Sequence, residues 1–500
     1  METDVHLEYY SAVQCKVRCD PGILMELSDH FTYFKDNYKF DPKYKARIWD
    51  GKIRLVNRMT RLIYAGLAQR IKQFCDSRGY TFSFDDQFLY DNVSVKEIED
   101  FMESLNLPDW LEIRDYQVDA IVKCLRSRRR TLLSPTSSGK SFIIYVINEW
   151  YRQKLNTKSL IIVPTIGLVN QMKADFESYG YKGSFNTSVE GLDKTNDHEF
   201  DTTITTWQSL DNGKTKLPKQ WYNQYQVVFG DEAHGAKATS IINILSSMVN
   251  TPYRFGTTGT LDNSELNKAT IYGLFGAPYR TTTTRDLIDD GHAADIKIKC
   301  IVLKYSDAER KEFHKAVIDK KTKLQRKRSY QEEVDYLVGH TRRTDFIKNL
   351  ALSLKGNKLV FFRLTDHGQA LYDSLKDHTN VFYIDGSVKG GERELIRKAI
   401  EEEENAILVA SLGTTSTGVS INRLHHMIAA SPSKSKIKVL QSIGRMLRQH
   451  DEKTHAVLYD IVDDLSHGKQ KNFVLSHFEE RAKIYDSEQF DYKIYTVGLK

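Results

Sequence analysis

Short apolar segments alternate with helix-forming stretches through most of this 500-residue chain, and this alternation constrains the fold more than any other feature. The apolar segments lie at 131–133, 159–163, 202–206, 226–230 and 253–257, and then at 296–303, 358–362, 380–384, 406–410, 426–430 and 456–460. Strands that alternate with helices predict parallel sheets joined by crossover helices. Such sheets bind ligands at the carboxyl ends of their strands, so we expect the functional residues there.

The same pattern divides the chain into four expected regions. A small basic α/β domain comes first, two tandem parallel-sheet α/β domains follow, and a C-terminal extension ends the chain. We place these regions at residues 1–108, 109–285, 286–456 and 457–500.

Composition and charge favour an intracellular protein. The chain has 72 basic and 66 acidic residues and five scattered cysteines without a CxxC pair, which is typical of reduced thiols. Cys15 and Cys19 have no second pair at ligand spacing, so we expect no zinc site. The N-terminus lacks a signal peptide, and apolar runs such as Leu160–Val163 are far shorter than the ~20 residues of a membrane span. We therefore expect a cytoplasmic protein with no membrane partner.

Positive charge is concentrated near the N-terminus. Residues 31–80 contain twelve basic and four acidic residues, and aromatic residues are interleaved with them, among them Tyr33, Phe34, Tyr38, Phe40, Tyr44, Trp49 and Phe74. Basic residues beside aromatics favour phosphate contacts together with base stacking. The alternative is a solvated basic face whose aromatics belong to a small core. The candidate nucleic-acid contacts are Lys43, Lys45, Arg47, Lys52 and Arg54.

A second charged stretch, residues 309–343, is rich in lysine and arginine and is expected to be helical. It is compatible with a solvated helix face and equally with an insertion that faces nucleic acid.

Two polar motifs follow apolar strands in the first α/β half. The loop Thr136-Ser137-Ser138-Gly139-Lys140-Ser141 lies between the strand 131–133 and a helical run, so its backbone N–H groups can point at a triphosphate. Ser134 stands where such loops usually have their first glycine. Asp231 and Glu232 end the apolar strand at 227–229, about ninety residues later. The pair of motifs predicts an ATP site.

The chemistry of phosphoryl transfer assigns a role to each polar group in these motifs. Lys140 can neutralise the β- and γ-phosphates, Ser141 can bind Mg²⁺, and Asp231 can hold the same ion through water. Glu232 can orient and deprotonate the attacking water. We therefore expect ATP and Mg²⁺ as cofactors.

Further motifs occur in a fixed order along both α/β halves. They are Arg114-Asp115-Tyr116-Gln117, Pro164-Thr165, Thr205-Thr206-Trp207-Gln208, Asp231-Glu232-Ala233-His234, Thr257-Thr258-Gly259-Thr260, Ser411–Val419 and Gln441–Arg448. In order, spacing and position after strands, they resemble the motifs of superfamily 2 helicases of the DEAH-spelled branch over residues 110–460. The first domain, around 40–54, resembles that of a phage recombination and repair helicase.

The resemblance implies two RecA-like domains that face each other across an ATP cleft. It implies that Gln117 reads adenine and that Gly418 lets the backbone pass close to the ligand. Arg445 and Arg448 lie three residues apart, share a face if helical, and would reach the γ-phosphate as arginine fingers.

The resemblance also assigns residues to nucleic acid and to coupling. Thr165, Thr206 and Thr414 would contact the nucleic-acid backbone at strand ends, although each could instead be a simple helix cap. The residues expected to link hydrolysis to strand movement are His234, Thr258, Thr260 and Gln441.

The function expected from these features is an ATP-dependent DNA helicase or translocase, acting as a monomer in a phage-infected bacterial host. By resemblance it unwinds or remodels forks, D-loops and four-way junctions, and also RNA–DNA hybrids, in recombination, repair and replication. The alternatives are an RNA helicase, the motor portion of a restriction system, and a DNA-binding scaffold without enzyme activity. A restriction nuclease would need a clustered Asp, Glu and Lys site; Asp41, Asp50 and Lys52 include the acid-x-Lys spacing, but no glutamate lies among residues 31–80.

Overall fold

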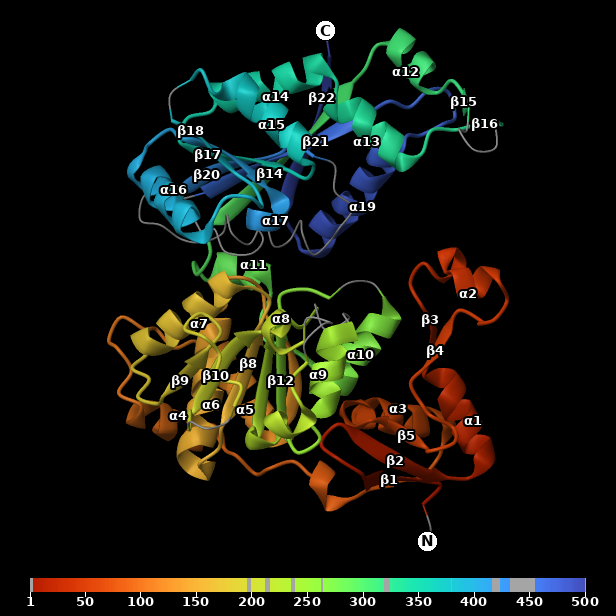
Figure 1. The fold of residues 1–500 in the computed structure, drawn as a ribbon, viewed down its shortest axis with the longest axis vertical. Helices are drawn as coiled ribbons and strands as arrows, with labels where there is room; N and C mark the ends of the chain where they lie inside the picture. The colour runs from red at the N-terminus through yellow and green to blue at the C-terminus, as the bar shows by residue number, and fades with distance from the viewer. Residues whose placement is uncertain are drawn as a thin grey trace. The chain divides into compact units, whose positions relative to one another are not determined.

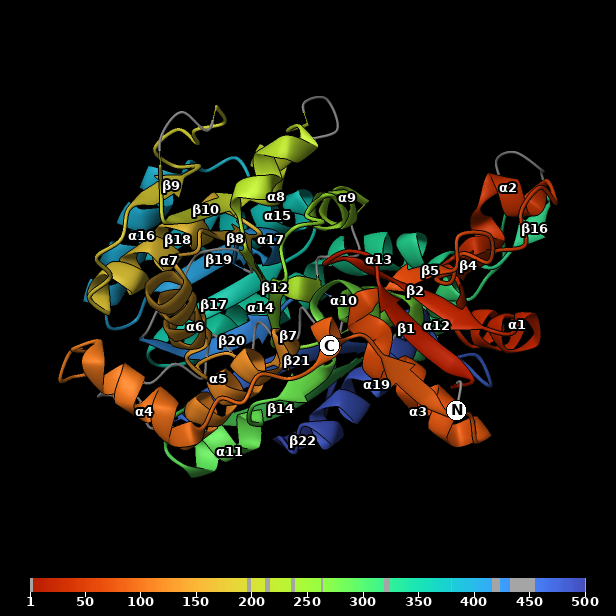
Figure 2. The ribbon, with the colours of Figure 1, turned by 90° about the horizontal axis from the view of Figure 1, so that it is seen from below.

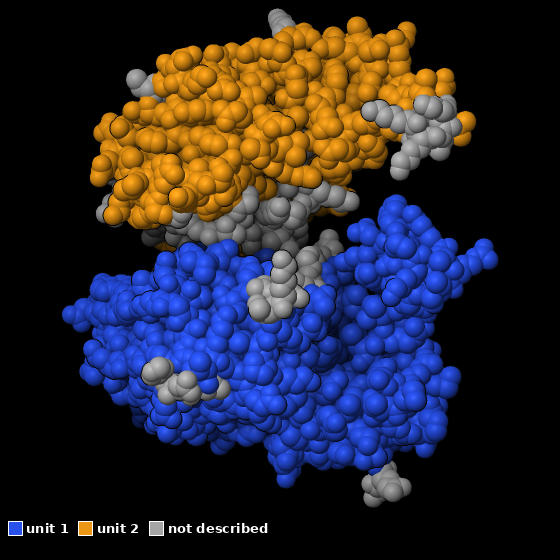
Figure 3. All heavy atoms as spheres, in the orientation of Figure 1, with its two compact units in different colours: residues 1–282 blue, residues 283–500 orange. Residues whose placement is uncertain are grey.

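The chain folds into two compact units, residues 1–282 and residues 283–500 (Figure 3). The computed structural model describes residues 3–195, 199–211, 216–234, 239–261, 264–318, 324–378, 380–415, 423–431 and 455–499. Within these residues, no helix is long and apolar enough to cross a membrane.

The first unit begins with a small α/β domain built on a four-stranded sheet of order β5-β2-β1-β6. Val5 and Leu7 of β1 alternate with polar residues and pack against Cys15 and Val17 of β2, so one face of this sheet forms a core. The elements of this domain are β1 (Val5–Tyr9), β2 (Gln14–Cys19), α1 (Pro21–His30), β5 (Leu62–Tyr64), η2 (Ala65–Leu67), α3 (Ala68–Arg78), β6 (Phe82–Phe84) and η3 (Asp86–Phe88).

Residues 32–54 form a separate excursion from this domain, which we name the protruding module (Figures 1 and 2). An antiparallel pair, β3 (Thr32–Phe34) and β4 (Lys52–Arg54), is its stem. The 3-10 helix η1 (Tyr38–Phe40) and the short helix α2 (Pro42–Lys45) form its outer part. Gly51 is the only buried residue of the module, so a hydrophobic core does not hold it together.

The larger part of the first unit is a seven-stranded sheet of order β13-β7-β12-β11-β8-β10-β9, parallel throughout. Val227 and Phe229 of β11 join the core beneath α5, α6 and α7, while Val228 joins the core beneath α9 and α10, so helices cover both faces (Figure 2). The strands are β7 (Arg129–Leu133), β8 (Ser159–Val163), β9 (Phe185–Thr187), β10 (Thr202–Thr206), β11 (Val227–Asp231), β12 (Tyr253–Thr258) and β13 (Pro278–Arg280). The helices are α4 (Val95–Ser104), α5 (Asp115–Ser127), α6 (Lys140–Leu155), α7 (Ile166–Ser178), α8 (Trp207–Leu210), η4 (Lys219–Gln224), α9 (Thr239–Ser247) and α10 (Glu265–Phe275).

Helix α4 belongs to this second sheet's core and not to the N-terminal domain. Ile98, Phe101 and Met102 form one apolar face, and the Phe101 ring meets the Trp150 ring of α6 edge-on at 5.0 Å. The expected boundary at residue 108 therefore lies too late, because the apolar side of α4 is buried against α5 and α6.

The second unit contains another seven-stranded parallel sheet, of order β18-β19-β17-β20-β21-β14-β22. Its strands are β14 (Asp295–Lys304), β17 (Asn357–Phe362), β18 (Val381–Ile384), β19 (Ile407–Ser411), β20 (Leu424–Ala429), β21 (His455–Asp464) and β22 (Asp491–Gly498). Its helices are α11 (Thr284–Asp289), α12 (Asp307–Phe313), α13 (Tyr330–Val338), α14 (Thr341–Ser353), α15 (Thr365–Leu375), α16 (Gly390–Glu402), α17 (Leu412–Thr415) and α19 (Phe473–Ser487). The two parallel sheets with a small N-terminal α/β domain confirm the expected fold class, and every expected strand is present.

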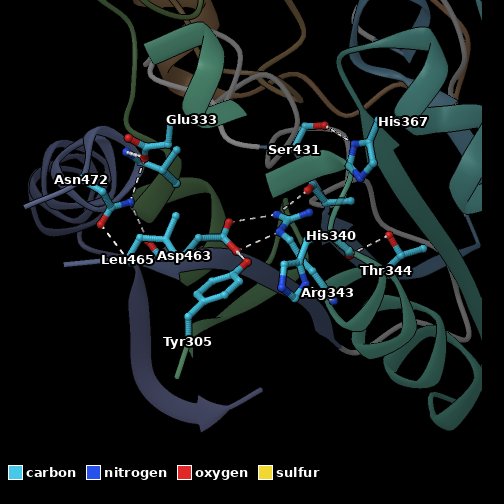
Figure 4. A network of polar contacts seen from close by, with 12 residues as sticks. Tyr305, Glu333, His340, Arg343, Thr344, His367, Ser431, Asp463, Leu465 and Asn472 are labelled. Atoms are coloured by element: carbon cyan, nitrogen blue, oxygen red, sulfur yellow. Dashed lines mark hydrogen bonds and ion pairs between the residues drawn. The ribbon is translucent and has the colours of Figure 1, made fainter. Parts of the chain in front are cut away.

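A buried polar network ties the C-terminal residues into this second sheet (Figure 4). Arg343 of α14 makes a paired contact with Asp463 of β21, with N–O distances of 2.8 and 3.0 Å, and both side chains are buried. The Tyr305 hydroxyl donates to the same carboxylate at 2.8 Å. The expected extension, residues 457–500, thus supplies most of β21, all of β22 and α19, so it is an integral part of the second unit.

The start of α19 is fixed by a carboxylate from another helix (Figure 4). Glu333 of α13 accepts bonds from the backbone N–H groups of Phe473 and Val474 at 2.9 and 2.8 Å. A carboxylate at this position satisfies N–H groups that have no partner within the helix, and it favours the positive end of the helix dipole. This contact is a second link between the C-terminal residues and the rest of the second unit, because α13 lies between β14 and β17 in the chain.

The charged stretch 309–343 is only partly helical. It begins within α12 and includes α13, but a two-stranded hairpin of β15 (Val317–Ile318) and β16 (Gln325–Arg326) interrupts it. The bidentate contact from Arg326 to Glu332, at 2.7 and 3.0 Å, fastens β16 to the first turn of α13. The expectation that this stretch is helical therefore holds for α12, α13 and the start of α14, and it fails for β15 and β16.

Candidate nucleotide site and nucleic-acid surface

The phosphate-type loop connects β7 to α6 at the carboxyl edge of the first sheet. Ser137 and Gly139 adopt left-handed conformations, with φ of 68° and 75°, so the chain turns sharply before α6 begins at Lys140. The left-handed conformation of Gly139 favours glycine, and a Cβ there would lie 2.3 Å from Nε2 of Gln117, so it would displace that amide from its bond to Ser138. The sixteen-residue helix α6 directs the positive end of its dipole toward this loop.

Side chains from the start of α5 hold the loop in place. Arg114 donates to the carbonyl of Ser137 at 3.1 Å, and Gln117 donates to the carbonyl of Ser138 at 3.0 Å. The Tyr116 hydroxyl donates to the same Ser138 carbonyl at 3.1 Å. The loop conformation is therefore fixed by the motif that precedes it by some twenty residues.

Lys140 and Ser141 begin α6 beside the acidic motif. The Lys140 ammonium lies 3.4 Å from the Ser134 carbonyl oxygen and 3.6 Å from Oε1 of Glu232. The Ser141 hydroxyl lies 3.1 Å from the hydroxyl of Tyr179. The structure thus brings the loop lysine and the motif glutamate together, as the sequence motifs require.

Asp231, the last residue of β11, and Glu232, which follows it, have opposite shifts of their pKa values. Burial, reinforced by the neighbouring Glu232 charge, raises the pKa of Asp231, and Thr257 donates to its Oδ1 at 2.6 Å. Burial would also raise the pKa of Glu232, but Lys140 and His234 outweigh it and lower this pKa. Glu232 adopts a left-handed backbone with φ of 51°, a strained conformation of the kind that occurs at functional sites. The arrangement keeps Glu232 ionised.

The three described residues expected to act in coupling form a continuous chain of contacts. Nδ1 of His234 lies 3.2 Å from Oε2 of Glu232 and 3.1 Å from the hydroxyl of Thr258. The Thr258 hydroxyl in turn donates to the carbonyl of Thr260 at 2.9 Å. A change in the position or charge of Glu232 can therefore be transmitted to Thr258, at the end of β12, through the His234 imidazole.

The strand-end threonines all make local hydrogen bonds. Thr165 accepts from the Leu168 N–H and Thr206 from the Ser209 N–H, each at 3.4 Å. Thr414, in the second unit, donates to the Ser411 carbonyl at 2.9 Å. The bonds of Thr165 and Thr206 agree with the helix-cap alternative, whereas Thr414 lies within α17 and its N–H donates to the Ser411 hydroxyl. Thr165 and Thr206 lie at the same carboxyl edge as the acidic motif.

In the protruding module, acidic side chains neutralise only some of the basic ones. Asp50 pairs with Arg54 at 2.5 Å, and Asp41 pairs with Lys35 at 3.0 Å. The Lys52 ammonium lies 5.3 Å from the centre of the Phe34 ring, within cation–π range. Four exposed basic residues have no carboxylate partner among the described residues: Lys39, Lys43, Lys45 and Arg47.

The remaining predicted site residues are Gly418, Gln441, Arg445 and Arg448, and they lie outside the described residues. Two described residues near the site carried no clear signal in the sequence. Tyr179 contacts Ser141 from the end of α7, and no motif marks it. Thr257 lies inside a recognised motif, but only the structure reveals that it bonds Asp231.

Three family descriptions match the chain in order. "DNA helicase UvsW, N-terminal" matches residues 2–85, "Type III restriction enzyme, res subunit" matches residues 110–263, and "Helicase conserved C-terminal domain" matches residues 342–450. The first match ends near β6, in agreement with the small domain seen in the structure.

Individual proteins give the same assignment over the full length. The ATP-dependent DNA helicase UvsW of Enterobacteria phage T4 is 34% identical over 526 aligned residues, and the alignment covers 100% of both chains. The crystal structure of T4 UvsW matches with a TM-score of 0.52 at 32% identity, covering 99% of this chain and 100% of that one. The DNA-bound restriction-modification enzyme LlaBIII has a TM-score of 0.57 at 14% identity, covering 78% of this chain and 32% of that one, and this likeness shows the fold alone. The chain therefore belongs to the UvsW family of ATP-dependent DNA helicases, a superfamily 2 family.

Proposed function

We propose that the protein uses ATP hydrolysis to remodel branched DNA, namely forks, D-loops and four-way junctions. The observation that carries this proposal is the protruding module, whose four basic side chains without carboxylate partners lie apart from the nucleotide motifs. A motor core holds one strand through its backbone, whereas a separate basic surface can bind a flanking duplex arm. A branched substrate offers both at once.

The nucleotide chemistry is assigned to the carboxyl edge of the first sheet. Lys140 binds the β- and γ-phosphates, and the ionised Glu232 orients and deprotonates the attacking water. The Ser141 hydroxyl and the Asp231 carboxylate suit Mg²⁺, which needs few protein ligands and retains several waters. When bound, Mg²⁺ would neutralise phosphate charge. Gln117 contacts adenine.

Other assignments extend from the sequence motifs. Arg445 and Arg448 stabilise charge on the γ-phosphate, Gly418 allows close backbone approach, and Gln441 acts in coupling. His234 transmits the state of Glu232 to Thr258 and Thr260, and its two short contacts support this role.

The nucleic-acid contacts are assigned to both units. Thr165, Thr206 and Thr414 contact the backbone of the nucleic-acid strand. Thr165 and Thr206 also cap the helices that follow them. We further propose activity on RNA–DNA hybrids, a monomeric state, and a role in phage recombination, repair and replication in the cytoplasm of the infected host.

The proposal is tested by ATP turnover with single-stranded DNA, duplex, fork, four-way junction, RNA–DNA hybrid and RNA as separate stimulants. Forks and junctions should lower the nucleic-acid concentration for half-maximal turnover below that of single strands. Glu232→Gln should retain ATP binding and accumulate ATP-bound complexes on forks, because its water-orienting base is absent. Equal stimulation by single strands and forks would contradict branch recognition, and stimulation by RNA alone would favour an RNA helicase.

A further inference from the structure

The outer end of the protruding module exposes two apolar side chains. Phe40 of η1 is 74% exposed, and Ile48, just after α2, is 79% exposed. The Lys45 ammonium lies 5.9 Å from the Phe40 ring centre, and Lys45 and Ile48 line the same open hollow of about 780 Å³. We name Phe40 and Ile48 the apolar tip.

The apolar tip does not hold the module together. The aromatic rings that pack within the module are different ones: Phe34 stacks on Tyr38 at 4.6 Å, and Tyr38 meets Tyr44 edge-on at 4.9 Å. Gly51 packs directly against the Tyr38 ring. Phe40 and Ile48 lie outside this cluster, so burial within the chain does not explain them.

The charge around the tip limits what can cover it. Lys39, Lys45 and Arg47 line the hollow together with Ile48, and no carboxylate among the described residues pairs with them. Asp50 lines the same hollow, but Arg54 pairs with it. Asp36, the remaining acidic side chain of the module, accepts bonds from Ser264 and Asn267 near the start of α10. An occupant must therefore combine anionic groups with an apolar face.

The end of a nucleic-acid duplex has this combination, because the flat face of the last base pair lies between two phosphate backbones. Along an uninterrupted duplex the base faces are stacked and unavailable, so a basic surface alone would suffice there. Stacking on an aromatic side chain is tolerant of sequence.

We propose that the apolar tip stacks on the base pair exposed at a duplex end or branch point, while Lys45 and Arg47 bind the flanking phosphates. The proposal rests on the proposed function, because it assigns the structure of DNA that the module selects. The module thereby distinguishes a junction from continuous duplex.

Binding to blunt duplexes without ATP tests the proposal directly. One duplex has open ends, and the other has the same sequence with both ends closed by a covalent ethylene glycol linker. The unaltered protein should bind the open duplex about tenfold more tightly, the order of one stacked base. The double variant Phe40→Ala, Ile48→Ala should bind both duplexes with the affinity that the unaltered protein has for the closed one.

Met59→Ala is the matched control, because Met59 is 95% exposed in the same domain but outside the module. It should keep the tenfold preference, and thermal unfolding of all variants should confirm the fold. The proposal is supported if the double variant loses the preference for the open duplex and Met59→Ala keeps it. An absent preference in the unaltered protein, or one that the double variant keeps, overturns it and leaves the tip to a protein partner. Fork-stimulated ATP turnover of the unaltered protein is measured separately. Its absence would contradict the proposed function, whereas the two duplexes test only the role of the apolar tip.

Discussion

The carboxyl edge of the first sheet and the protruding module are built in opposite ways, although both belong to the first unit. At the sheet edge, Asp231 and Glu232 are held by buried strands, and side chains of α5 fix the phosphate-type loop. In the module only Gly51 is buried, and its basic side chains are exposed.

The difference follows from what each region must do. Phosphoryl transfer depends on prearranged charges in a site that excludes water, where small displacements are costly. Binding to a polyanionic backbone depends on reach and on positive charge, and it tolerates mobile side chains. We therefore expect changes in the two regions to have separable effects.

Lys140→Ala should produce the largest effect and confine it to the sheet edge. The substitution removes the charge that lies 3.6 Å from Glu232, so ATP turnover with saturating DNA should fall by about 10³-fold. Fork affinity without nucleotide should stay within about twofold, the normal scatter of a neutral surface change. Steady-state ATPase assays and fork titrations measure the two quantities. Near-normal turnover would remove Lys140 from the ATP site.

Charge reversal at Lys43, Lys45 and Arg47 should produce the next largest effect, confined to the module. Replacement of all three by Glu should weaken fork binding by about 10²-fold, because three phosphate contacts become repulsions. Turnover at saturating single-stranded DNA should survive.

The matched control is a triple reversal of Lys96, Lys182 and Lys219, exposed lysines of the same unit without a carboxylate partner among the described residues. Lys182 precedes β9, Lys219 begins η4 and Lys96 lies in α4, so all three are outside the protruding module. This variant has the same net charge, so an equal loss of fork affinity would show that only total charge matters.

Two glycines offer the same substitution in both regions. Gly139 and Gly51 have φ of 75° and 78°, and an added Cβ would lie 2.3 Å from Gln117 and 2.4 Å from Tyr38, respectively. A left-handed alanine costs about 1–2 kcal/mol before any clash. Gly139→Ala should lower ATP affinity by about tenfold and leave fork binding unchanged. Gly51→Ala should lower fork affinity by about tenfold and leave ATP binding unchanged. Nucleotide and fork titrations on both variants measure this, and identical profiles would contradict the separation.

The smallest effect should distinguish two arginines of the module. Arg54 pairs with Asp50, whereas Arg47 has no carboxylate partner among the described residues. Arg47→Gln should weaken fork binding by about fivefold, and Arg54→Gln by less than about twofold, because Asp50 holds the Arg54 guanidinium and keeps it from contacting a phosphate. Fluorescence anisotropy resolves the difference, and the reverse order would contradict the pairing.

Much of the sheet architecture could be predicted from the sequence, because apolar strands buried on both faces leave a continuous local signal. The strand 202–206, for example, was expected at the residues that β10 occupies. The contact of His234 with Thr258 was also expected from the motifs, whereas the bond from Gln117 to the Ser138 carbonyl required the structure.

Long-range packing carried no comparable signal. The apolar face of α4 could belong to either neighbouring domain, and only its contact with Trp150 decides. Likewise, nothing in the sequence around Arg343 predicts that it pairs with Asp463, which lies 120 positions later in the chain. Only the structure shows that Asp50 pairs with Arg54, and therefore which basic residues of the module have no carboxylate partner among the described residues.

The salt dependence of binding tests the central claim, that the module supplies a separate set of phosphate contacts, most directly. On duplex DNA, each phosphate that the protein neutralises adds about 0.9 to the steepness of log affinity against log salt. The account predicts that the Lys43, Lys45, Arg47 reversal flattens the slope for a fork by about 2 to 3 and leaves the slope for a single strand unchanged. Equal flattening on both substrates, or none on either, would contradict it.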